Sequence, residues 1–173
     1  MGKPLYISTD YLRKQTIIND NVQGEILESV IKQVQETEIQ SLLGTTLYYK
    51  LNDIITDGSI TGATNSNYKE LLDDYILPTL LQYCVWNGSI YLNYKFTNKN
   101  ISTQKSDDSE PLGLDELKYL RDELRNTAQF YGERLVKQLK SNTDLYPEYT
   151  ECTPGGIHPD NTAFFSGIFI PNC

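Results

Sequence analysis

The stretch from Tyr68 to Tyr94 constrains the fold more than any other part of the chain. Its apolar residues recur at spacings of three and four, which gathers them on one side of a helix: Leu72, Tyr75, Ile76, Leu80, Tyr83 and Cys84. A continuous helix of this length would run roughly 40 Å, long enough to serve as a wall for other helices. Pro78 has no N–H and its ring crowds the preceding turn, so it predicts a kink near Asp74 to Pro78, or two helices in tandem.

Composition and charge limit the classes of partner. The chain has 173 residues, which is typical of one domain with its own core. Its 15 Lys and Arg against 23 Asp and Glu give a net charge of -8, which disfavours gripping nucleic acid or anionic lipid. No apolar run is long enough to span a bilayer and no signal peptide is recognisable, so we expect synthesis in the cytoplasm and no membrane partner.

The N-terminal residues 1–19 are predicted to form an extended arm with one or two short turns. Leu5 and Ile7 lie on one side of an extended segment, with Tyr6 between them, and all three are candidate contacts with a partner protein. Ser8, or Thr9 or Asp10 beside it, offers a cap for a short helix over YLRKQ.

Residues 20–140 are predicted to form a helical domain. A helix over residues 22–43 is expected to begin at an Asp20 cap and to end at Gly44, where a glycine can adopt a positive φ. Thr45 or Thr46 then caps a second helix, which carries Leu47 to Ile55. The polar, turn-forming stretches over residues 56–67 and 97–111 are expected to be loops, the second of them flexible.

The next helix has the most regular apolar spacing in the chain. Between Leu114 and Leu139 leucines and other apolar residues repeat at three and four, with acid and base pairs between them. This face could form a coiled coil with another chain, but packing on the Tyr68 to Tyr94 helix within one fold is the more ordinary use. The predicted fold class is therefore mainly α, a small antiparallel helical bundle.

The last segment, residues 141–173, reads as an extended and potentially β-forming C-terminal tail. Prolines and glycines interrupt it, no Lys or Arg follows Lys140, and it ends in a dense apolar group that is also a candidate partner contact: Phe164, Phe165, Ile168, Phe169 and Ile170. Such a tail must pack on its own helices or dock on a partner, for example by adding a strand to a sheet.

Signals for catalysis, cofactors or metals are missing from the sequence. It has no GxGxxG, phosphate-loop, HExxH or GxSxG motif, and its sole histidine, His158, lies in a glycine-rich turn. The three cysteines are odd in number and far apart, which indicates neither a disulfide framework nor a zinc site; Cys84 is expected to be a small buried hydrophobe. We therefore predict neither an enzyme nor a cofactor or metal site.

Three stretches together resemble a known family. They are EIQSLLGTTLYYKLNDI at Glu38–Ile54, the block that follows Tyr68, and GLDELKYLRDELRNTAQFYGERLVKQL before Lys140. In this order they resemble the small helical head-tail connector proteins, also called adaptors, of tailed double-stranded-DNA bacteriophages, with the crAss-like group nearest. The resemblance covers residues 20–140.

The resemblance implies a structural protein in the neck of a virion. Such a protein would form a homo-oligomeric ring, dodecameric in the family, beneath the portal protein and beside further neck or tail proteins. DNA would pass through the ring without specific binding, which suits the net negative charge. Two alternatives stay open: a tail-completion or stopper protein of similar build, and a small cytosolic ligand-binding helical protein with a pocket near Tyr83, Trp86 and Tyr91.

Overall fold

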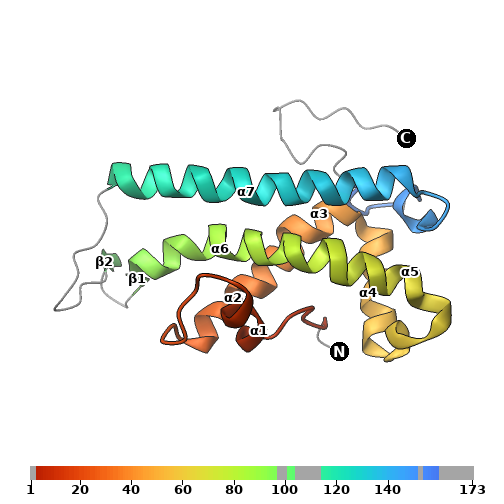
Figure 1. Ribbon diagram of the computed structural model, residues 1–173, viewed down its shortest axis with the longest axis horizontal. Helices are drawn as coiled ribbons and strands as arrows, with labels where there is room; N and C mark the ends of the chain where they lie inside the picture. The colour runs from red at the N-terminus through yellow and green to blue at the C-terminus, as the bar shows by residue number, and fades with distance from the viewer. Residues whose placement is uncertain (1–2, 97–100, 104–113, 152–153, 160–173) are drawn as a thin grey trace.

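The computed structural model describes residues 3–96, 101–103, 114–151 and 154–159, and the fold is mainly helical (Figure 1). The α-helices and strands in chain order are α1 (Thr9–Gln15), α2 (Gly24–Val34), α3 (Gln40–Leu43), α4 (Thr45–Thr56), α5 (Ser66–Leu71), α6 (Leu77–Asn93), β1 (Tyr94–Phe96), β2 (Ile101–Thr103) and α7 (Leu114–Ser141). Two π-turns, Gln35–Ile39 and Leu72–Ile76, join α2 to α3 and α5 to α6, and short 3-10 turns follow α4 and α7.

The stretch around Tyr68 to Tyr94 is an uninterrupted helical run through α5, the π-turn and α6. The predicted disturbance before Pro78 takes the form of that π-turn, in which the Leu77 N–H donates to the Leu72 carbonyl five residues back. The wider turn lies directly before the proline, whose ring would crowd a regular α-helical turn. The run therefore stays helical, and the alternative of two separate helices is wrong.

The first long helix also ends where the sequence predicts, but its caps differ. Gly44 has a φ of 76° and ends α3, as expected. The helix begins later than predicted, at Gly24 after Gln23, and Asp20 does not cap it. The predicted cap of α4 by a threonine side chain is also wrong. The Thr45 N–H donates to the carbonyl of Ile157 (2.9 Å), so a residue far along the chain satisfies the start of α4.

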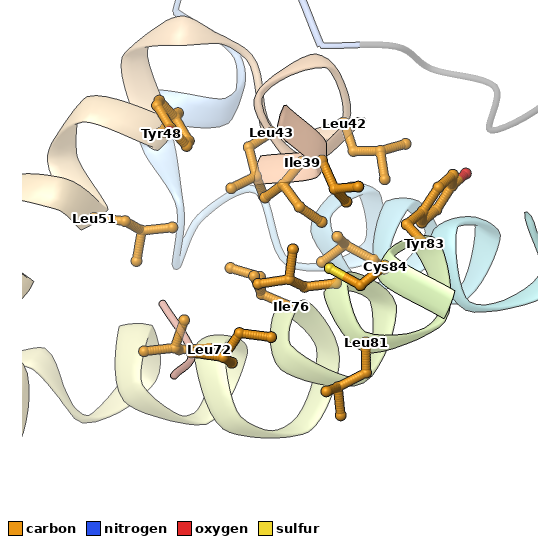
Figure 2. Close-up of a cluster of buried hydrophobic side chains, with 14 of the residues drawn as sticks. Ile39, Leu42, Leu43, Tyr48, Leu51, Leu72, Ile76, Leu81, Tyr83 and Cys84 are labelled. Carbon is orange, nitrogen blue, oxygen red and sulfur yellow. The ribbon is translucent and has the colours of Figure 1, made fainter. Parts of the chain in front are cut away.

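Helices α6 and α7 run antiparallel and side by side along the length of the molecule, which confirms packing within one fold (Figure 1). The Thr79 hydroxyl is fully buried between them and lies 3.2 Å from the Tyr131 carbonyl of α7, to which it can donate. The core gathers beside this pair, where Figure 2 shows Ile39 and Leu43 facing Leu72 and Ile76. Cys84 is buried there as predicted, and burial raises the pKa of its thiol.

The two terminal segments pack on the helices more closely than extended arms would. Ser8 caps α1 by accepting from the Tyr11 N–H, as predicted. The residues before Ser8 are held against the helices by the Gln35 side chain. Its Oε1 accepts from the Tyr6 N–H (2.9 Å) and its Nε2 donates to the Pro4 carbonyl (2.8 Å).

Beyond α7, the described part of the predicted tail folds back on the chain. Tyr146 and Tyr149 are buried, and the Tyr146 hydroxyl donates to the Asn67 carbonyl (3.1 Å). Residues 154–159 reach the junction of α3 and α4, where the Pro159 ring lies against Gly44.

A short hairpin was not predicted. Strands β1 and β2 pair antiparallel, with Tyr94 opposite Thr103 and Phe96 opposite Ile101, at the start of the stretch expected to be a flexible loop.

Candidate interaction surfaces

The predicted N-terminal contact residues have different environments. Leu5 is 37% exposed, whereas Ile7 is 5% exposed and belongs to the core. Tyr6 is half-buried against the core, with its ring 6.0 Å from that of Tyr48. Ile7 is thus buried within the chain, where the Gln35 hydrogen bonds hold this segment against its own helices, and its contact with a partner stays a prediction. The C-terminal candidates, Phe164, Phe165, Ile168, Phe169 and Ile170, lie outside the described residues.

An apolar ridge on the outside of α7 was not among the predicted contacts. Tyr119 is 72% exposed, Phe130 is 62% exposed and Leu120 is 40% exposed. Tyr119 and Phe130 are eleven residues apart, close to three helical turns, so their side chains project from the same side of the helix. Leu120 flanks them. We call these three residues the apolar ridge.

A basic cavity of about 310 Å³ lies between α6 and the N-terminal half of α7. Its lining residues are Trp86, Leu117, Lys118, Arg121, Asp122 and Arg125. The Arg121 guanidinium carbon lies 5.9 Å from the centre of the Trp86 ring, and that ring meets Tyr83 edge-on. Arg125 pairs with Asp122 (3.2 Å). Three basic side chains thus face one carboxylate.

The sequence held a signal for this cavity that the prediction did not use. Lys118, Arg121 and Arg125 are spaced by three and four, so one side of the helix presents all three. On sequence alone, we interpret these three residues as members of acid and base pairs along the exposed side of the helix. Their convergence on Trp86 depends on the packing of α7 against α6, which is not visible in local spacing.

A second cavity of about 300 Å³ lies between α2 and α6. It is lined by Glu25, Ile26, Ser29, Val30, Gln33 and Tyr91. The Tyr91 hydroxyl lies 3.3 Å from Gln33 Oε1. Trp86 and Tyr91, which the ligand-binding alternative placed in one pocket, therefore line two separate cavities, and Tyr83 is buried beside Trp86.

An acidic cluster surrounds two tyrosines where α5 meets the segment after α7. The Tyr68 and Tyr146 rings meet edge-on at 5.7 Å, and the Tyr68 hydroxyl donates to the Glu148 carboxylate (2.8 Å). Burial and this hydrogen bond raise the pKa of Tyr68, and the nearby charge of Glu151 adds to the effect. Burial together with the charge of Glu70 raises the pKa of Tyr146. We call Glu70, Glu148 and Glu151 the acidic cluster.

Candidate metal ligands do not gather among the described residues. Across the residues that the structure describes, no three His, Cys, Asp or Glu side chains come together in a way that could hold a metal ion. His158 lies half-buried in the segment beside α4. In the same described portion, no helix combines the length and the apolar character needed to cross a bilayer.

Comparison with known proteins gives a family but no function. Residues 39–158 match a family described as "Family of unknown function (DUF6712)". The match begins at the end of the π-turn before α3 and ends in the segment 154–159. It includes α6, which lines both cavities, as well as α7 and the acidic cluster. No curated protein and no solved structure matches the chain.

Proposed function

This chain belongs to DUF6712, a family of unknown function, and we propose that it is a structural protein of a tailed bacteriophage particle, a head-tail connector at the junction of portal and tail. In this role, copies of the chain form a ring in the neck of the virion and contact the portal protein and adjacent neck or tail proteins. The genome passes through the ring without specific binding. The proposal starts from the resemblance of residues 20–140 to the connector family.

The observation that carries the proposal is the apolar ridge. Tyr119, Leu120 and Phe130 are large, lie outside the core and sit on one long helix. Large exposed aromatic and aliphatic side chains favour contact with other proteins, since aromatic residues are enriched in interfaces and leaving them in water costs free energy. A ring built from one repeated contact needs two different surfaces on each copy.

The charge of the chain supports the same role. A net charge of -8 repels the phosphate backbone, so a channel lined by such copies would let DNA slide and not grip it. Bound DNA in a conduit would slow its exit.

Electron microscopy of particles that carry an epitope tag on this protein tests the proposal. We expect the antibody label at the portal-tail junction. Label along or at the far end of the tail would favour the tail-completion or stopper alternative. Particles without label, together with the protein in the soluble fraction of infected cells, would contradict a virion role.

The ligand-binding alternative has one structural feature in its favour, the basic cavity. Its volume of about 310 Å³ is at the small end of ligand pockets, which span roughly 300–1,000 Å³ and are mostly apolar. A lining with four charged side chains suits a charged group of a partner better than a drug-sized apolar molecule.

A further inference from the structure

The basic cavity is unusual in an acidic chain. Within the described residues, neither Lys118 nor Arg121 has an ion-pair partner, although Arg13, Lys69 and Arg125 each pair with a carboxylate nearby in sequence. Asp115 and Glu123 of the same helix are not part of the lining. The cavity therefore presents an excess of positive charge, and a carboxylate from outside would complement it.

Arg121 is already oriented for such a partner. Its guanidinium lies over the Trp86 ring, which in turn is held edge-on by the buried Tyr83. A stacked guanidinium loses less conformational freedom when it binds a carboxylate than a freely rotating one would.

The complementary surface is on the same molecule but at its other end. The N-terminal part of α7, which lines the cavity, lies at one end of the long axis, whereas α5 and the segment after α7 lie at the other (Figure 1). The acidic cluster belongs to that second end. Because α7 itself separates the two surfaces, they cannot meet within one copy.

We propose that the basic cavity of one copy receives the acidic cluster of a second copy, so that copies associate head to tail through charge complementarity. This inference rests on the proposed function, to which it adds the two surfaces of the repeated contact. When the contact joins two different surfaces, each copy can bind one neighbour through each surface. If every copy is rotated by the same angle relative to the one before it, the series can close into a ring. Glu70 and Glu151 are exposed and provide the carboxylates, while Tyr68 holds Glu148.

Charge reversal with complementation tests the contact. Variant A is K118E/R121E and variant B is E70K/E151K, each in the full chain and measured by sedimentation velocity at low and at moderate salt. We expect the wild type to associate, more weakly as salt rises, and A and B to sediment as monomers. An equimolar mixture of A and B, and the fourfold variant that combines both changes, should recover association, because each reversed surface meets its reversed partner.

Matched controls separate the contact from net charge and from folding. K32E, and separately E25K/E28K, change the charge of exposed positions on α2 and should leave association unchanged. Circular dichroism checks that each variant keeps its helices. If R121E alone loses structure, the K118E variant replaces A, since Lys118 is exposed.

Several results would overturn the inference. One is a wild type that stays monomeric at millimolar concentration; another is association that A and B leave unchanged, or that their mixture does not recover. Binding of a labelled DNA duplex that K118E/R121E abolishes would instead assign the cavity to phosphate. None of these results moves an antibody label away from the neck of the particle, so the proposed function can stand or fall separately.

Discussion

The apolar face of α7 is buried to different extents along the helix, although Leu117 near its start is also buried. In the C-terminal half Ala128, Leu135 and Leu139 are fully buried, whereas in the N-terminal half Leu120 is exposed beside Tyr119. The difference lies in the neighbours: α3 passes beneath the C-terminal half, and the N-terminal half lies against α6 (Figure 1). Spacing therefore creates an apolar face, but the elements that cross the helix decide how much of that face is left for a partner.

The largest effect should come from the buried half. We expect Leu135→Ala to lower the free energy of unfolding by about 3 kcal/mol, because it removes a fully buried side chain and leaves a cavity. Leu120→Ala is the matched control in the open half and should cost less than about 1 kcal/mol. Urea denaturation followed by circular dichroism measures both. Equal losses at the two positions would mean that the halves are equally packed and would remove the comparison.

Residues 154–159, which follow α7 and fold back on the chain, contact Gly44 at the junction of α3 and α4. We expect Gly44→Ala to cost about 2 kcal/mol, since an L residue at positive φ is strained. The new Cβ would also lie 2.7 Å from Pro159 Cγ. Gly58→Ala is the comparison without a contact, because nothing lies within 4 Å of its added Cβ. Its ψ of 5° is left-handed helical, whereas the ψ of 161° at Gly44 is tolerated almost only by glycine. Thermal unfolding measures both variants. We expect the larger loss at Gly44, where backbone strain and the Pro159 contact act together, and equal losses would contradict that expectation.

Gly44 also shows what the sequence could and could not predict. Its place after Leu43, the Ser8 cap and the helical period from Tyr68 onward are local signals, and each was confirmed. The partner of Thr45 was not predictable, because Ile157 is 112 residues away in the chain.

The basic cavity was missed for the same reason. Arg121 and Trp86 belong to different helices, and the spacing within either helix does not report their contact. The burial of Ile7 in its own chain was not predictable either, because a short apolar segment looks the same in sequence whether it reaches a neighbour or folds onto Gln35.

A smaller effect should come from the Tyr68 hydrogen bond that holds the returning segment. Tyr68→Phe removes its donor to Glu148 and should cost about 1 kcal/mol at neutral pH. The pKa of Tyr68 is raised in the folded state, first by burial and then by this bond, so folding favours the neutral phenol. Its contribution is complete below the ordinary tyrosine pKa of 10.0 and is lost as pH rises above that value.

The alkaline side of the stability profile is the measurement. We expect the wild type to lose stability above pH 10 and Tyr68→Phe to lose it less steeply. Tyr6→Phe is the control, because burial also raises the pKa of Tyr6 but its hydroxyl has no hydrogen-bond partner among the described residues. That variant should flatten the profile without a cost at neutral pH. If the stability of all three proteins falls equally with pH, the alkaline loss does not come from Tyr68 or Tyr6.

The smallest effect on stability is expected at the apolar ridge, and it is the most informative about function. Tyr119→Gln and Phe130→Gln should change the free energy of unfolding by no more than about 0.5 kcal/mol, because both rings are mostly in solvent and Gln is a good helix former. If the ridge lies in the contact between copies, the same variants should weaken self-association in sedimentation while the isolated chain stays equally stable. A stability loss comparable with that of Leu135→Ala would mean that the ridge packs on residues of its own chain and is not available to a neighbour.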